Sequence, residues 1–382
     1  MPEPVVLILG CGAGGVTAAR EARRLLPASH RVIVIDRDAD ASFPPSYPWV
    51  VTGERRPESI RRHRAQLARR GIEFVNADVR QIDVANRYVR AESREFRYDY
   101  LILALGAQPA MEAIPGLAET AHGLHTLETA ERLAATLRYF SGGRVMLAVT
   151  GLPFKGPSVP YETAMLLEHH FHSRRMRQKV EIAVYTPEAL PLEFLGSENG
   201  EAITGLLAHK GIEFHAETTL VSVDPVRREA SFAGGALSPF QLLIAVPQLR
   251  SPAILREAGL VDETGWVSVS PRSMETAIED VFAVGDLTYL RLPNGLPLPK
   301  AGIFAERQAQ TAARHIAFRI KGGAPPPPFE TDGRMLIEVG AGAAAVVEGD
   351  FSSPQPLALK QPSIVWHMAK LALERYWLWR TY

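Results

Sequence analysis

The chain has 382 residues, 46% of them apolar, and 42 basic and 42 acidic side chains, which predicts two or three packed domains and gives no basic excess for binding nucleic acid. Its single cysteine, Cys11, excludes an intramolecular disulfide, a CxxC redox pair and a cysteine-rich metal site. No apolar run approaches the roughly twenty residues that cross a bilayer, and no secretory signal is recognisable at the start, so we expect a cytoplasmic protein.

The first predicted elements form a βαβ unit around a glycine-rich turn. Residues 5–9 are an apolar run typical of a buried parallel strand, residues 16–26 form a helix, and residues 31–35 form a second strand that ends at Asp36. The turn at 10–15 has the sequence Gly-Cys-Gly-Ala-Gly-Gly, which fits GxGxxG. Such a turn binds a pyrophosphate at the helix start, and the acid after the second strand accepts hydrogen bonds from a ribose. Within the turn, Cys11 is expected to be a packing residue.

The elements that follow continue an alternation of helices and strands. Residues 41–53, rich in proline and aromatic residues, are predicted to form a loop that caps a pocket, and residues 59–70 a basic helix. Residues 162–177 and 180–185 predict the helix and strand of a second βαβ-like unit. Further helices are predicted at 128–139, 200–210, 303–320 and 362–382, and further strands at 72–78, 88–91, 100–104, 144–149, 212–215, 220–223, 242–245, 281–284, 335–339 and 344–348.

This order of elements predicts an α/β fold with two Rossmann-like dinucleotide-binding domains and a small C-terminal region that ends in an amphipathic helix. We expect a discontinuous dinucleotide-binding domain at 1–110 and 270–322, and a second Rossmann-like domain with a degenerate nucleotide site at 111–269. Residues 323–382 are expected to add a strand pair and a helix that contacts a membrane or another protein surface.

Two later segments bear on which dinucleotide is bound. Residues 101–107 and 280–286 are each an apolar strand that runs into a glycine turn, and in the second of them Asp286 directly follows the glycine. Either could be an ordinary core strand and turn. Their order and separation are similar to those of flavoproteins with two dinucleotide-binding domains, in which the later acid holds the ribityl chain of FAD.

Together these motifs resemble the sulfide:quinone oxidoreductase family, which includes flavocytochrome c sulfide dehydrogenase. The resemblance also rests on Pro-Ser-Tyr-Pro-Trp-Val at 45–50, Pro-Tyr-Glu at 160–162 and Leu-Pro-Lys-Ala-Gly at 298–302. It implies FAD as the cofactor of the domain at 1–110 and 270–322, with a helix whose positive end raises the flavin potential. Because no cysteine lies near the expected position of the flavin methyl group, we expect that the FAD is not covalently held. The cofactor-binding residues that it implies are Gly10, Gly12, Ala13, Gly14, Gly15, Asp36, Arg37, Pro45, Val79, Ala104, Leu105, Gly106, Gly285, Asp286, Lys300, Ala301 and Gly302.

The chain departs from this family at the redox cysteines. Sulfide-oxidising members have one cysteine six residues before the glutamate of Pro-Tyr-Glu, where this chain has Gly156, and another before an Ile-Glu pair, where it has Met335. A third cysteine of some members would fall near His125. In the family, polysulfur is built between two cysteine sulfurs, so without these nucleophiles we do not expect sulfide oxidation by that mechanism.

A reaction with NAD(P)H would need a second phosphate-binding turn after the strand at 144–149. The turn there lacks GxGxxG, and its prolines cannot donate backbone amides to a phosphate. No acid ends the following strand, because Tyr185 is followed by Thr-Pro. Gly151 and Gly156 keep the NAD(P)H alternative open, because such turns can be degenerate.

Glu162 and Lys300 are the candidate catalytic residues. In quinone-reducing relatives a glutamate at the position of Glu162 is implicated in proton delivery to the quinone, and partial burial would suit its pKa to that role; the alternative is an acid that only complements the helix dipole. Lys300 would stabilise negative charge on the flavin or else pair with a surface acid. His169 and His172 share a helix face, but without further ligands we expect no metal site.

The C-terminal segment holds three of the five tryptophans, interleaved with leucines and basic residues as in an interfacial helix. In the family this end contributes to membrane docking; the alternative is a helix packed on the body or in a homodimer interface. A run of arginines at 55–70 could contact anionic lipid or a partner, or form an ordinary charged surface.

We therefore predict an FAD-dependent oxidoreductase that transfers electrons from an unidentified donor to a quinone or other acceptor, peripheral on the inner membrane. One alternative is an NAD(P)H dehydrogenase with a degenerate nucleotide site. The other is a flavin-binding partner protein or redox sensor without catalysis.

Overall fold

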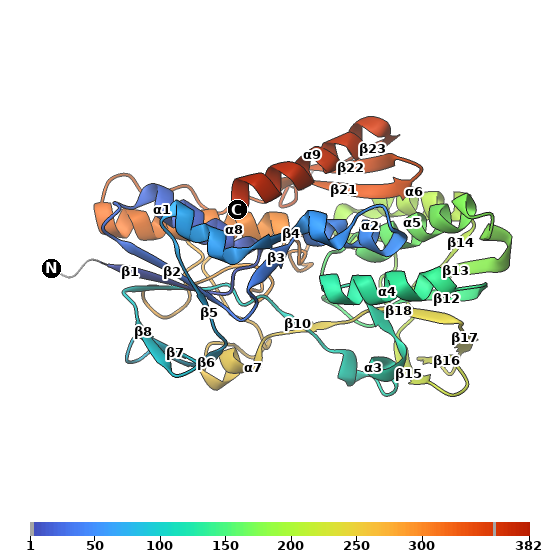
Figure 1. The fold of residues 1–382 in the computed structure, drawn as a ribbon, viewed down its shortest axis with the longest axis horizontal. Helices are drawn as coiled ribbons and strands as arrows, with labels where there is room; N and C mark the ends of the chain where they lie inside the picture. The colour runs from blue at the N-terminus through green and yellow to red at the C-terminus, as the bar shows by residue number, and fades with distance from the viewer. Residues whose placement is uncertain (1–3, 354–356) are drawn as a thin grey trace.

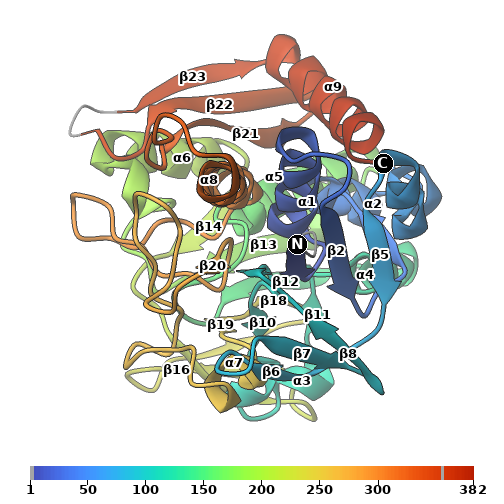
Figure 2. The same ribbon diagram turned by 90° about the vertical axis from the view of Figure 1, so that its left-hand side faces the viewer.

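Two parallel sheets lie side by side in the computed structural model, which describes residues 4–353 and 357–382 (Figure 1). A smaller antiparallel sheet and the C-terminal helix lie over one face of this pair (Figures 1 and 2). The predicted fold class, with two Rossmann-like units and a C-terminal region that ends in a helix, is confirmed.

The first sheet has the strand order β20-β9-β1-β2-β5, and all its pairs are parallel. Its β-branched strands are buried on both faces, as parallel strands require. Helices α1 and α8 cover one face, and a meander of β6, β7 and β8 with the short helix α7 covers the other. The bounds are β1 Val5–Leu9, α1 Ala13–Leu25, β2 Arg31–Asp36, β5 Glu73–Asn76, β6 Val79–Asp83, β7 Tyr88–Ala91, β8 Arg94–Arg97, β9 Tyr100–Leu103, α7 Ala253–Glu257, β20 Val281–Ala283 and α8 Gly302–Lys321.

The second sheet has the order β11-β18-β12-β13-β14 and is also parallel. Helices α4, α5 and α6 pack on one face, and α3 with the meander β15, β16 and β17 packs on the other. The antiparallel pair β10 and β19 joins the two units. The bounds are β10 Gln108–Pro109, α3 Leu117–Thr120, β11 His122–Gly123, α4 Leu127–Tyr139, β12 Gly143–Val149, α5 Val159–Ser173, β13 Val180–Tyr185, α6 Ser197–His209, β14 Ile212–His215, β15 Leu220–Asp224, β16 Glu229–Phe232, β17 Leu237–Pro239, β18 Leu242–Val246 and β19 Leu249–Arg250.

The C-terminal region consists of the antiparallel strands β21 (Asp332–Gly340), β22 (Ala343–Asp350) and β23 (Ala358–Ser363), followed by helix α9 (Ile364–Thr381). Figure 2 shows α9 running above the first unit, with its last turn beside α1. Within the described residues, none of the helices combines the length and the apolar character that a bilayer crossing requires.

Two predicted elements are wrong. The segment 59–70 is not one helix: it forms the 3₁₀ turns η2 (Pro57–Ile60) and η3 (Arg64–Arg70) on either side of strand β4 (Arg61–His63), which pairs with β3 (Asp40–Ser42). The backbone of β4 forms its hydrogen bonds with β3 and not within a helix.

The segment 41–53 is not a loop either. It contains η1 (Pro44–Ser46) and α2 (Tyr47–Thr52), because a proline at the first turn of a helix costs no hydrogen bond. The short strands and helices that the sequence did not predict are β3, β4, β6, β8, β10, β11, β16, β17, β19, β23, α3 and α7. The 3₁₀ turns η4 (Met111–Ala113), η5 (Arg177–Lys179) and η6 (Glu193–Leu195) complete the elements.

Candidate active site

The predicted cofactor-binding segments meet at one edge of the first sheet. Strands β1, β9 and β20 are neighbours and parallel, so the turns that follow them lie side by side at their carboxyl ends. Ligands of open α/β sheets bind outside these strand ends. A Cβ built on Gly302, at the start of α8, would lie 3.7 Å from the Cβ of Ala13. The starts of α1 and α8 therefore face the same place.

Three glycines of the first turn differ in what surrounds them. A Cβ on Gly10, which has φ +94°, would stand 2.3 Å from the carbonyl oxygen of Ala104, and a Cβ on Gly15 would stand 1.9 Å from that of Gly10. These two glycines let the helix approach the sheet. Gly12 is exposed, and a Cβ there would meet no protein atom within 4 Å. Gly12 therefore keeps the outer side of the turn open.

The start of α1 offers free backbone donors. No side chain caps this helix and its first turn contains no acid, so the amides of Ala13 and Gly14 have no intrahelical partner and meet the positive end of the helix dipole. Asp36 lies beside them and accepts hydrogen bonds from the Cys11 amide at 2.5 Å and from the Arg64 guanidinium. The donor set and the open side at Gly12 fit the pyrophosphate and ribose of a dinucleotide.

Cys11 is buried in the core beneath this turn. Burial raises the pKa of its thiol to about 12, against the opposing effect of the Arg64 charge. A thiol with this pKa carries almost no thiolate at neutral pH and is a poor nucleophile. Its expected role as a packing residue agrees with this environment.

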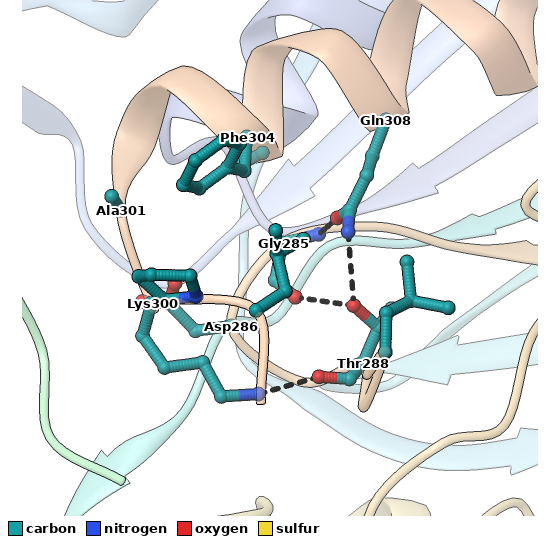
Figure 3. Close-up of a pocket in the computed structure, with 11 residues that line it drawn as sticks. Gly285, Asp286, Thr288, Lys300, Ala301, Phe304 and Gln308 are labelled. Atoms are coloured by element: carbon teal, nitrogen blue, oxygen red, sulfur yellow. Dashed lines mark hydrogen bonds between the residues drawn. The ribbon is translucent and has the colours of Figure 1, made fainter. Parts of the chain in front are cut away.

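Lys300 lies at the start of α8, as Figure 3 shows, with its ammonium group turned toward Thr288. It donates a hydrogen bond to the Thr288 carbonyl and lies 4.2 Å from the ring centroid of Trp266. Burial lowers the pKa of Lys300 to about 8, and the nearby Asp286 carboxylate opposes that shift. Gln308 accepts a hydrogen bond from the Gly285 amide at 2.5 Å, which holds the turn after β20 (Figure 3). Lys300 therefore faces this turn and does not pair with a surface acid.

The other predicted cofactor residues line this edge or the protein surface. Ala104 is buried, and Leu105, Gly106 and Ala301 are half-buried at the strand and helix ends. Val79 begins β6 and is half-buried, whereas Arg37 and Pro45 are exposed. The individual contacts of these side chains with FAD stay predictions.

Two amides of the turn after β12 are already engaged within the protein. The Thr150 amide donates to the Val246 carbonyl at 3.0 Å, and the Gly156 amide donates to the Lys300 carbonyl at 2.9 Å. Pro153 has no amide hydrogen, and its carbonyl accepts from Leu249. Because these two amides are engaged and Pro153 has none, the turn is poorly suited to bind a phosphate.

The end of β13 is equally occupied. Tyr185 stacks between His215 and Phe232, with ring centroids 4.2 and 4.6 Å apart. The next acid along the chain, Glu188, is buried and accepts hydrogen bonds from the hydroxyls of Tyr161 and Thr186. This carboxylate is not directed at a ribose.

Glu162 is buried, but it does not act as a helix cap. Its carboxylate forms an ion pair with Lys370 of α9, and the two side chains are 5% and 3% exposed. Burial raises the pKa of Glu162 to about 7, while the Lys370 charge opposes the shift. The pair therefore holds a titratable proton near neutral pH in the protein interior.

A second acid joins this pair. Glu338 of β21 is 1% exposed and is hydrogen-bonded to Nδ1 of His367 at 2.9 Å, and burial raises its pKa. The His367 side chain is 16% exposed, so it connects the buried group with water. Sequence reasoning missed Glu338, His367 and Lys370. Two signals could have indicated them: an acid in an apolar strand and a lysine among aromatic residues.

The three positions at which the resemblance implies cysteines have different surroundings. Gly156 contacts the Lys300 backbone, and Met335 is buried in the core. Burial, aided by the charge of Lys155, lowers the pKa of His125 to about 4, so this imidazole is neutral at pH 7. In the part of the chain that the structure describes, no three histidine, cysteine or acidic side chains group as metal ligands would.

The sequence matches the model of the family described as pyridine nucleotide-disulphide oxidoreductase over residues 4–315. The chain belongs to this family. Members of the family are flavin-dependent oxidoreductases, which confirms the expected enzyme class and FAD as the cofactor. FAD fits the open turn at Gly12, the free amides of α1 and the carboxylate of Asp36 described above.

The expected resemblance to sulfide:quinone oxidoreductases is also confirmed. The mitochondrial sulfide:quinone oxidoreductase of Mus musculus is 24% identical over 365 residues, 92% of this chain and 79% of the mouse protein. The sulfide-quinone reductase of Aquifex aeolicus is 24% identical over 395 residues, 98% and 90% of the two chains. The crystal structure of the Aquifex aeolicus sulfide:quinone oxidoreductase has a TM-score of 0.90 at 23% identity and covers 99% of this chain and 91% of its own, which shows a shared fold.

Not all relatives are named for sulfide. The demethylphylloquinone reductase NdbB of Synechocystis is 24% identical over 334 residues, 84% of this chain and 80% of that protein. The family match therefore extends to enzymes named for a quinone without sulfide.

Proposed function

We propose that the protein reduces a quinone at a membrane surface, using two electrons that its FAD accepts from a donor other than NAD(P)H. Relatives named as quinone reductases support the acceptor. The absence of both family cysteines argues against polysulfur formation. The engaged amides after β12 argue against a nicotinamide donor. FAD, when bound, supplies reversible storage of two electrons.

The residues of the first unit bind and tune this cofactor. The amides of Ala13 and Gly14 would hold the pyrophosphate, and Asp36 the ribose. The start of α8 presents its free amides and the Lys300 charge on the same side. Both would favour negative charge on the flavin ring and would therefore raise the reduction potential of the flavin.

The observation that carries the proposal is the buried ion pair of Glu162 and Lys370, together with a second buried acid, Glu338, that interacts electrostatically with both. Conversion of a quinone to a quinol consumes two protons along with two electrons. A buried carboxyl group with a pKa of about 7 can give up a proton and regain it near neutral pH. His367, hydrogen-bonded to Glu338 and partly exposed, would link this group of side chains with water.

The exposed face of α9 supports a membrane as the source of the quinone. Its buried side carries polar groups, among them Lys370 and Glu374, while Met368, Tyr376 and Trp379 are exposed. A helix on a water-covered surface has the opposite arrangement, with its apolar side chains buried and its polar side chains exposed. Apolar and aromatic side chains on an exposed helix face suit the lipid–water boundary, which supports a peripheral location.

Rapid mixing of the FAD-loaded protein under anaerobic conditions tests the donor. NADH and NADPH are expected to leave the flavin absorbance near 450 nm unchanged over seconds, and sulfide to bleach it slowly if at all. Fast bleaching by NADH would replace this proposal with the NAD(P)H-dehydrogenase function. Fast bleaching by sulfide, coupled to quinone reduction, would show that sulfide chemistry proceeds without the cysteines.

A further inference from the structure

Three arginines from distant parts of the sequence gather at the C-terminal end of α9. They are Arg20 of α1, Arg70 at the end of η3 and Arg380 of α9. Figure 2 shows the last turn of α9 beside α1, and Arg70 donates a hydrogen bond to the Trp379 carbonyl at 3.3 Å. Arg20 is half-buried, and the positive charges that act on it are those of Arg380 and Arg70.

Acids balance these charges only in part. In residues 4–353 and 357–382, neither Arg20 nor Arg380 forms a close ion pair, although the charge of Glu306 acts on both. The Arg380 guanidinium lies 5.7 Å from the ring centroid of Tyr376. The two acids nearby are already engaged. Glu21 pairs with Arg24 and Arg314.

The second acid, Glu306, accepts a hydrogen bond from the Trp377 indole at 2.8 Å. Burial raises the pKa of Glu306, and the charges of Arg380 and Arg20 oppose that shift. Three arginines that share one such acid keep a net positive charge, which attracts an anion.

The cluster borders the apolar face of α9. Trp379 is 74% exposed and Tyr376 50% exposed, and both lie within one turn of Arg380. Tryptophan and tyrosine rings favour the headgroup level of a bilayer, which is where lipid phosphates lie. A surface that places aromatic rings and unpaired guanidinium groups together is complementary to an anionic phospholipid, because arginine binds phosphate oxygens through its forked donors.

We propose that Arg20, Arg70 and Arg380 bind the phosphate of an anionic phospholipid headgroup while Tyr376 and Trp379 enter the headgroup layer. This inference rests on the membrane surface of the proposed function and names its chemistry. The arginines supply a preference for negatively charged lipid, and the aromatic residues supply binding to any lipid surface. The two contributions can be separated by lipid composition.

Flotation of the FAD-loaded protein with lipid vesicles tests the proposal. Vesicles of phosphatidylcholine alone are compared with vesicles that contain about 30% phosphatidylglycerol, at low and high salt. The test variant is R20Q/R70Q/R380Q. The matched control is R97Q/R138Q/R256Q, which removes three exposed arginines elsewhere on the surface, and R20K/R70K/R380K keeps the charge without the guanidinium fork.

Wild-type protein is expected to bind the anionic vesicles at least tenfold more tightly than the neutral ones. R20Q/R70Q/R380Q should lose that preference, because each basic residue near a charged membrane adds to binding. The control should keep it, and the lysine variant should keep at least part of it. Equal binding of wild type and R20Q/R70Q/R380Q to anionic vesicles would overturn the proposal, as would an equal loss in the control.

Two further readouts fix the source of the phosphate and the relation to catalysis. Release of the protein from anionic vesicles by about 10 mM inorganic phosphate, but not by chloride of equal ionic strength, would assign the cluster to a small anion and overturn the lipid assignment. Reduction of a water-soluble quinone in the absence of lipid should be the same in wild type and R20Q/R70Q/R380Q. Failure of the quinone proposal would appear in this second assay and leave the vesicle result standing.

Discussion

The ammonium group of Lys370 and the carboxylate of Glu162 meet in the protein interior although 208 residues separate them in the sequence. The pair connects helix α9 to helix α5 of the second unit. Glu374, one turn further along α9, reaches Ser46 at 2.5 Å and Arg55 at 3.0 Å in the segment around α2. Helix α9 therefore contacts the rest of the protein largely through its polar side chains, and most of its apolar side chains remain exposed.

Removing only the lysine of this pair should destabilise the protein strongly. K370M removes the charge paired with Glu162, so the buried carboxyl group must take up a proton to fold, and loss of one member of a buried pair costs up to about 3–5 kcal/mol. The double variant K370M/E162Q should recover most of this loss, because no buried charge remains. The free energy of unfolding in urea, measured on FAD-loaded protein, tests the expectation. K179M, at an exposed lysine, is the control, and equal stability of K370M and K179M would contradict the buried pair.

The pH dependence of quinone reduction should follow the protonation of Glu162. Its carboxyl group carries a proton below its pKa of about 7 and loses it above, so a proton donor at this position works less well as the pH rises. The wild-type rate should fall above pH 7, and E162Q should be slower by about 100-fold at pH 6 and insensitive to pH in this range.

A matched control for this effect is E188Q. Burial also raises the pKa of Glu188 to about 7, but its carboxylate is bonded within the second unit to Tyr161 and Thr186. E188Q should keep the wild-type pH profile. An unchanged profile in E162Q would remove Glu162 from the proposed proton path.

Lys300 should raise the reduction potential of the flavin. With a pKa lowered to about 8, its side chain is charged below that pH and neutral above it. K300M should lower the two-electron midpoint potential at pH 7 by about 20–40 mV, which corresponds to about 1–2 kcal/mol for the loss of one nearby charge. Potentiometric titration with redox dyes measures the change.

Above pH 8 the same titration provides an internal check. The wild-type potential should approach that of K300M there, whereas K300R, which stays charged, should not show this loss. Coincident potentials for wild type and K300M at pH 7 would place the Lys300 charge away from the ring.

The two glycines of the first turn should respond differently to the same change. G15A places a methyl group against the Gly10 carbonyl, so it should destabilise the apoprotein by about 1–3 kcal/mol or more. G12A meets no protein atom, so its apoprotein should melt like wild type, yet bind FAD at least tenfold more weakly because the methyl group faces the pyrophosphate. Thermal melting and fluorescence titration with FAD measure both. Wild-type FAD affinity in G12A would move the pyrophosphate elsewhere.

The sequence was most informative where chemistry requires a local pattern. The turn at 10–15, Asp36 and the later Asp286 follow strands and lie at one sheet edge, as periodicity and spacing predicted. The helix predicted at 59–70 was wrong because this segment pairs with β3 and bonds to the Asp36 carboxylate. Such tertiary contacts cannot be read from the periodicity of the sequence.

The sequence predicted only one member of the buried group formed by Glu162, Lys370 and Glu338, for the same reason. Glu162 was a candidate because it belongs to a motif, but nothing local connects it with Lys370 or Glu338. Their meeting depends on how β21 and α9 fold back over the second unit. A lysine in an amphipathic helix is ordinarily solvated, and only the tertiary structure shows that this one is 2% exposed.

Reoxidation of the photoreduced protein by a short-chain quinone, mixed anaerobically in a single turnover, tests the central claim most directly because it needs no donor. We predict that the flavin absorbance returns within seconds, with one quinol formed for each FAD, and that the rate falls as the pH is raised through 7. A flavin that stays reduced in the presence of excess quinone would contradict the account.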